Sequence, residues 1–134
     1  MHRTMKEKVK EYTEKMSKLI PSFEEHWYSD DACFNFGEES SIYGVFSDFS
    51  TLVIDRLKNN HLTNAEQVFS FIESVVVLGG DEANAACICF LENILNLVPN
   101  EIEPKTFVPF LGQKSRKSCR DYDIFTGVKT NGLH

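Results

Sequence analysis

The chain has 134 residues and a formal net charge of −6, and 42% of its residues are hydrophobic and 25% charged. This composition is close to that of average soluble domains, so it excludes collagen, a wholly disordered chain and a disulfide scaffold. No apolar run approaches the roughly 20 residues that span a membrane, and no signal-peptide pattern opens the sequence. Acidic residues outnumber basic ones 20 to 14, which disfavours binding to nucleic acid. We therefore expect one cytoplasmic domain over residues 1–134 that binds neither membrane nor nucleic acid.

Apolar residues recur every three or four positions along most of the chain, and this period predicts an all-α protein with six or seven helices. Pro109 is expected to shorten or kink one of these helices, because proline cannot donate a backbone hydrogen bond. Residues 129–134 continue no apolar pattern and are expected to form a frayed tail. The predicted helices cover residues 5–19, 22–28, 41–59, 63–78, 82–97, 103–111 and 113–125.

Polar residues at the starts of several helices predict N-terminal caps. Thr4 is followed three residues later by a glutamate, which fits the capping box, where each side chain accepts from the other residue's backbone N–H. The same spacing occurs at Ser22 and at Thr63, and Asp81 is expected to cap the helix that follows it. These caps predict where four of the helices begin.

The segments 63–78 and 82–97 are separated by little more than Gly79-Gly80, so their helices are expected to run antiparallel as a hairpin. A run of three valines, residues 75–77, is also compatible with a strand, but the capped length of the segment favours a helix. Such hairpins packed in series would form the single domain. Its core is expected to contain Val68, Phe69, Ile72, Val76, Leu91, Ile94 and Leu95.

The charges are unevenly distributed along the chain. Residues 19–55, which we call the acidic block, contain eight carboxylates and no lysine or arginine, and residues 56–104 are also acidic. Residues 1–18 and residues 105–134 are both basic. An acidic centre between two basic ends is the most unusual feature of the sequence.

Two interpretations of the acidic block remain open: a solvated face without a partner, or a surface that binds a basic protein. The second is favoured because aromatic residues are interleaved with the carboxylates, as in interfaces that bury rings centrally and attract opposite charge at the rim. The predicted partner-binding residues are Glu24, Trp27, Asp30, Asp31, Glu38, Glu39, Tyr43 and Asp48.

No residue pattern indicates an enzyme, and neither a cofactor nor a metal is expected. The sequence lacks a zinc-protease motif, a nucleophile elbow and a phosphate-binding glycine loop. The adjacent carboxylate pairs have neither the geometry of a glycosidase nor the spacing of an EF-hand. The four cysteines match no zinc pattern, and we expect them to be reduced thiols: Cys33, Cys87, Cys89 and Cys119.

Residues 65–127 resemble a family of small, all-helical bacterial immunity proteins of contact-dependent growth inhibition and related toxin systems. The resemblance rests on Phe71-Ile72-Glu73, on Phe90-Leu91-Glu92-Asn93 and, most specifically, on the Leu-Gly-x-x-Ser-Arg stretch from Leu111 to Arg116. That stretch is expected to be structural, with Gly112 breaking a helix and Ser115 or Arg116 bracing the next one.

The resemblance implies a cognate inhibitor, monomeric when free, that forms a 1:1 complex with one toxin domain and has no catalytic activity. Nuclease toxins tend to be basic because their substrates are anionic, so an acidic inhibitor suits such a partner. The alternative is a small helical scaffold or adaptor, unconnected with any toxin, that binds a peptide or helix in a groove.

Overall fold

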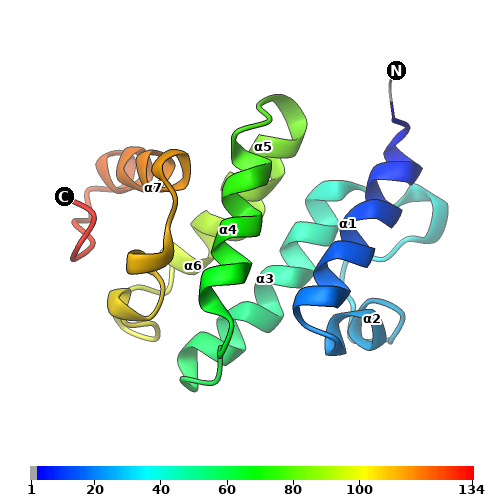
Figure 1. The fold of residues 1–134 in the computed structure, drawn as a ribbon, viewed down its shortest axis with the longest axis horizontal. Coiled ribbons are helices and arrows are strands. Elements are labelled where there is room, and N and C mark those ends of the chain that lie inside the picture. The colour runs from blue at the N-terminus through cyan, green and yellow to red at the C-terminus, as the bar shows by residue number, and fades with distance from the viewer. Residues whose placement is uncertain (1–2) are drawn as a thin grey trace.

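The computed structural model describes residues 3–134, and over these residues it contains seven α-helices and no strand, which confirms the predicted all-α single domain. The helices follow one another along an elongated molecule, with α1 and α2 at one end and α7 at the other (Figure 1). None of the described helices is long and apolar enough to cross a membrane. The helices are α1 (Met5–Leu19), α2 (Ser22–Trp27), α3 (Ile42–Lys58), α4 (Ala65–Val76), α5 (Gly80–Ala86), α6 (Glu92–Leu95) and α7 (Gln113–Thr126).

The predicted hairpin is formed by α4 and the continuous helical rod that follows it. In that rod, a π-helical turn at Cys87–Leu91 joins α5 directly to α6. The chain reverses between α4 and α5 at Gly79 and Gly80, whose φ angles are +74° and +61°, a conformation that side chains other than glycine rarely adopt. The two helices then pack against each other.

The predicted cap of α1 is confirmed. The Thr4 side chain accepts a hydrogen bond from the Glu7 N–H at 3.1 Å, and the Glu7 carboxylate accepts from the Thr4 N–H at 3.2 Å. Ser41 caps α3 with a single hydrogen bond, in which its side chain accepts from the Gly44 N–H at 3.4 Å. Local pairs of this kind can be identified from sequence because both partners lie within one turn.

The other three predicted caps are wrong, because each helix begins at a different residue from the one its pattern suggests. Ser22 and Asp81 lie inside the first turns of α2 and α5, and the residue that immediately precedes α4 is Asn64 instead of Thr63. Asn64 makes no cap either, since its side-chain amide donates to the Leu19 carbonyl at 2.8 Å. A hydrogen bond to the end of α1 therefore takes the place of a cap within α4.

One core extends from α1 to the C-terminal residues. Its centre is aromatic: the Phe90 ring lies 5.7 Å from Phe49 and 5.9 Å from Phe69, measured between ring centroids. Of the predicted core residues, Val76 is only half-buried, and its neighbour Val75 is buried in its place. The six others are buried as predicted: Val68, Phe69, Ile72, Leu91, Ile94 and Leu95.

The predicted helix over 103–111 is instead two short 3-10 turns, Pro104–Thr106 and Val108–Phe110. An α-helix through this region would need the N–H of Pro109, which does not exist, and Phe107 between the turns has a φ of −136°. Proline thus prevents the helix altogether rather than shortening it.

The C-terminal residues 129–134 do not fray but pack against α7. Thr130 donates to the Asp123 carboxylate from its N–H at 2.8 Å and from its hydroxyl at 3.0 Å, and Leu133 is buried. The Arg116 guanidinium donates to the Gly132 carbonyl at 2.8 Å. The prediction of a frayed tail is wrong because the sequence suggests that Asp123 and Arg116 are solvated surface charges, whereas both residues hydrogen-bond to the tail.

Candidate partner-binding surface

The loop between α2 and α3, residues 28–41, presents acidic and aromatic side chains on one part of the surface. Its aromatic residues are unusually exposed for their type: Tyr28 is 74%, Phe36 is 62% and Phe34 is 41% accessible. The carboxylates of Asp30, Asp31, Glu38 and Glu39 are exposed beside them, and Glu24 is exposed on α2. We call this set the acidic loop surface: Glu24, Tyr28, Asp30, Asp31, Phe34, Phe36, Glu38 and Glu39.

Asp48, which was predicted to contact a partner, instead anchors this loop from inside the protein. It lies on α3 and is only 2% accessible. Its carboxylate accepts from the N–H of Cys33 at 3.2 Å and of Phe34 at 3.0 Å, and the His26 ring lies 3.3 Å away. A buried carboxylate needs such donors, so the prediction fails because the loop folds back over α3.

Further contacts fix the rest of the loop. The Asn35 amide donates to the Trp27 carbonyl at 2.8 Å, and the Phe36 N–H donates to the Ser40 hydroxyl at 2.8 Å. Gly44 of α3 lets the loop approach closely, since a Cβ at this position would lie 2.7 Å from the Cβ of Phe34. The loop backbone that carries Phe34 and Phe36 is therefore held in a defined position.

The two predicted aromatic contacts are less exposed than the aromatic residues of the loop. Trp27 is 3% accessible and belongs to the core, stacked at 6.1 Å on Phe23, so its prediction as a surface contact is corrected. Tyr43 is half-buried, and its hydroxyl lies 3.3 Å from an Asp81 carboxylate oxygen. At this end of the molecule, the exposed aromatic residues are Tyr28, Phe34 and Phe36 of the loop, where no helical period could assign them to the core.

Most of the acidic loop surface carries uncompensated charge. Glu38 pairs with Lys6 of α1 at 3.1 Å, although both side chains are largely exposed to solvent, so the pairing is weak. Across residues 3–134, no ion pair includes the other carboxylates of this surface: Glu24, Asp30, Asp31 and Glu39.

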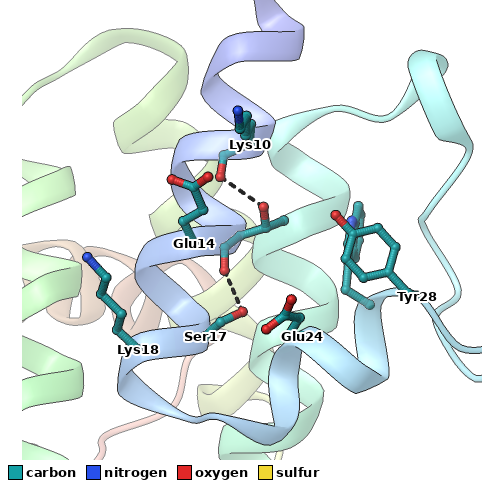
Figure 2. Close-up of a pocket in the computed structure, with 8 residues that line it drawn as sticks. Lys10, Glu14, Ser17, Lys18, Glu24 and Tyr28 are labelled. Atoms are coloured by element: carbon teal, nitrogen blue, oxygen red, sulfur yellow. Dashed lines mark hydrogen bonds between the residues drawn. The ribbon is translucent and has the colours of Figure 1, made fainter.

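A groove lies beside this surface, between α1 and α2, and has a volume of about 410 Å³ (Figure 2). A second hollow of about 280 Å³ adjoins it on the side of the loop and is partly lined by Glu38. At the far end of the molecule, a third hollow of about 450 Å³ separates Val76 of α4 from α7, where Phe125 lines it. The acidic loop surface is thus continuous with the first two hollows.

The stretch from Leu111 to Arg116 has a structural role, as expected. The Glu73 carboxylate of α4 accepts from the Lys114 N–H at 2.9 Å and from the Ser115 N–H and hydroxyl at 2.8 Å, which caps α7. A Cβ at Gly112 would lie 2.4 Å from the Glu73 side chain, so a larger residue here would displace the capping carboxylate. Although partial burial acts to raise the pKa of Glu73, these donors hold that pKa below its usual value. No local sequence pattern identifies Glu73 as the cap of α7, because it lies about 40 residues before that helix.

Within residues 3–134, no cluster of histidine, cysteine and carboxylate side chains could hold a metal ion. The candidate site therefore consists of the acidic loop surface, which Asp48 anchors to α3, and the adjoining groove.

The comparisons with known proteins assign the chain to a family without assigning an activity. Residues 5–127 match the family described as "Domain of unknown function (DUF7674)", and since this covers most of the chain, the protein belongs to that family. No curated protein and no solved structure matches the chain.

Proposed function

We propose that this protein is an immunity protein that binds and neutralises a basic, nuclease-type toxin domain in the cytoplasm through its acidic loop surface. It does so as a monomer in a 1:1 complex and without catalysis of its own. The observation that supports this most directly is a set of exposed carboxylates, Asp30, Asp31 and Glu39, beside the exposed rings of Tyr28 and Phe36 on an anchored loop.

The physical basis is electrostatic attraction followed by burial of the aromatic residues. Uncompensated carboxylates increase the rate of encounter with a basic partner, an effect that salt screens. Because the backbone of the loop is already anchored, binding costs it little conformational entropy, and burial of the exposed rings contributes to slow dissociation. A fast-binding inhibitor suits a toxin that must be neutralised inside a living cell.

The test is a four-fold charge reversal, Asp30→Lys, Asp31→Lys, Glu38→Lys and Glu39→Lys. The variant should keep its helical circular dichroism spectrum, because all four side chains are exposed. Its association with the toxin domain encoded beside its gene should slow by about tenfold or more at low salt, and added salt should narrow the difference. Growth rescue of cells that express this toxin measures the same loss in vivo.

A matched control changes the net charge equally at a distance from the loop: Asp55→Lys, Glu66→Lys, Glu101→Lys and Glu103→Lys, all at exposed positions. The association rate of the control variant should fall much less than that of the loop variant, because charges near the contact surface interact with the partner more strongly than distant charges. If the loop variant still protects cells and binds at an unchanged rate, the acidic loop surface is only a solvated face.

The adaptor function remains a second candidate because of an exposed apolar patch on α7. Phe125 is 85% and Ile124 is 75% accessible, and Phe125 borders the 450 Å³ hollow. An adaptor that used this hollow would lose its partner on Phe125→Asp and keep it in the four-fold loop variant. An immunity protein that uses the acidic loop surface predicts the reverse.

A further inference from the structure

Two lysines of α1 lie beside the acidic loop surface. Lys6 and Lys10 line the hollow of about 280 Å³ that adjoins the loop, and the only other charged residue in its lining is Glu38. The Lys6 amine lies 3.1 Å from a Glu38 carboxylate oxygen. Among residues 3–134, Lys10 takes part in no ion pair. The α1 side of this hollow is therefore cationic, whereas the loop side is anionic.

The ion pair between Lys6 and Glu38 joins two distant parts of the chain. Lys6 lies in the first turn of α1, and Glu38 lies in the 3-10 turn Gly37–Glu39 of the loop. The two side chains are 73% and 83% exposed. An ion pair between such exposed side chains is weak, so a competing cation can displace Lys6 at a small cost. Lys6 thus occupies one carboxylate of the acidic loop surface without closing it off.

A cationic ligand of this surface meets Lys6 at one edge. Its own cation can pair with Glu38 only when the Lys6 amine moves away, and until then the two positive charges repel each other. The carboxylates of Asp30, Asp31 and Glu39 have no ion-pair partner in the described chain. A ligand that pairs with several of these carboxylates therefore loses a smaller share of its binding energy to Lys6 than a ligand that depends on Glu38.

We infer that Lys6 is an internal competitor for the acidic loop surface: it pairs with Glu38 in the free protein and lowers the affinity of the surface for cationic ligands until one displaces it. The inference rests on the proposed function, since it takes the natural ligand to be a basic protein, and it adds a regulation of the same surface by α1. Loss of the Lys6 charge should consequently strengthen binding.

The experiment measures this competition with capped pentalysine as the cationic ligand, so that it does not depend on the toxin domain. The full-length protein labelled with nitrogen-15 is titrated at low salt, and the backbone amide signals of Glu38 and Glu39 report binding. Lys6→Gln should bind pentalysine about twofold more tightly than the wild type does, and added salt should remove the difference. The substitution should leave the fold intact, because the Lys6 side chain is exposed.

Lys15→Gln is the matched control, since it removes the same charge from the same helix. Positions 6 and 15 are about two and a half helical turns apart, so Lys15 lies on the opposite face of α1, where it pairs with Glu11. Lys15→Gln should strengthen pentalysine binding less than Lys6→Gln does. When Glu38→Gln is already present, Lys6→Gln should also have a smaller effect, because no carboxylate remains at position 38 for Lys6 to hold.

Equal effects of Lys6→Gln and Lys15→Gln would show that only the net charge matters. An equal effect of Lys6→Gln with and without Glu38→Gln would show that Lys6 repels the ligand but does not compete for Glu38. Either result overturns the inference, as does pentalysine that shifts neither amide signal. Failure of the proposed function is detected separately, by an unchanged association rate of the four-fold loop variant with the toxin domain.

Discussion

Two buried carboxylates hold irregular segments onto the helices. Asp48 on α3 and Asp123 on α7 are each 2% accessible, and each accepts from backbone N–H groups of a segment that folds back over its helix. Burial of a carboxylate is unfavourable unless donors surround it. The loop over α3 and the C-terminal tail are consequently fixed parts of the fold, and the acidic loop surface depends on Asp48 without including it.

Asp48→Ala should lower the free energy of unfolding by about 1–3 kcal/mol, because it leaves the N–H groups of Cys33 and Phe34 without their acceptor. Urea denaturation followed by circular dichroism measures the change. Asp31→Ala is the matched control, since that carboxylate is exposed, and it should change stability by less than about 0.5 kcal/mol. Equal stability of the two variants would contradict the anchoring role of Asp48.

The four cysteines should react with a thiol reagent at very different rates. Cys33 is exposed, whereas Cys119 is 1% accessible, and its burial raises the pKa of its thiol to about 12. Burial also raises the pKa of Cys87. Because the thiolate is the reactive form, alkylation at pH 7 followed by mass spectrometry should modify Cys33 first and Cys119 last. Modification of Cys119 in the folded protein as fast as Cys33 would show that its site is not closed.

The solvent exposure of a residue in the candidate surface could be predicted where it follows from the local sequence alone. Asp30, Asp31, Glu38 and Glu39 are adjacent charged pairs outside any apolar pattern, and all four are exposed as predicted. Asp48 could not be predicted, because only the folded loop supplies its donors. The exposure of each aromatic residue depends in the same way on the path of residues 28–41, which no periodicity describes.

Helix positions follow from local sequence, whereas their ends depend on tertiary contacts. The apolar period correctly predicts α1, α2, α3, α4 and α7 to within about two residues at each end. The predicted cap of α4 does not form, because the residue at its start, Asn64, hydrogen-bonds to the end of α1. The π-helical turn at Cys87–Leu91 has no recognisable signal, since its residues continue an ordinary apolar run.

At the level of elements, the clearest prediction concerns the cap that α4 provides for α7. Glu73→Ala removes the acceptor for the N–H groups of Lys114 and Ser115 and should lower the free energy of unfolding by about 1–2 kcal/mol at pH 7. Glu66→Ala, an exposed position on the same helix, is the control. Urea denaturation at several pH values measures both.

The pH dependence of this effect has a definite sign. The pKa of Glu73 is lower in the folded protein than in the unfolded chain, where a glutamate has a pKa of about 4.3. The carboxylate therefore stabilises the fold fully above that pH, and the stabilisation is lost as the pH falls through the folded pKa. The difference between wild type and Glu73→Ala should shrink below about pH 4. A difference that stays constant down to pH 2 would show that the charge of Glu73 plays no part.

At the scale of the whole molecule, one basic region of the sequence lies beside the acidic block and the other lies at the opposite end. The acidic loop surface and α1 lie at one end and α7 at the other (Figure 1). Lys6 of α1 reaches Glu38, so the basic N-terminal helix compensates a small part of the acidic block that the sequence suggests is uncompensated. The remaining carboxylates face solvent at the end that also carries the groove.

The two ends are joined by a single core, which predicts one cooperative unfolding transition. The buried cluster runs without interruption from Tyr12 through the phenylalanines of α3 and α4 to Leu133. Neither end has a separate core, so neither should remain folded alone. Trp27 fluorescence reports the α2 end and far-ultraviolet circular dichroism reports all helices, and in urea the two midpoints should coincide. Glu73→Ala, which removes the cap of α7 at the opposite end from Trp27, should lower both midpoints equally. A shift in the circular dichroism midpoint without a shift in fluorescence would show instead that α7 unfolds independently of the end that carries the candidate surface.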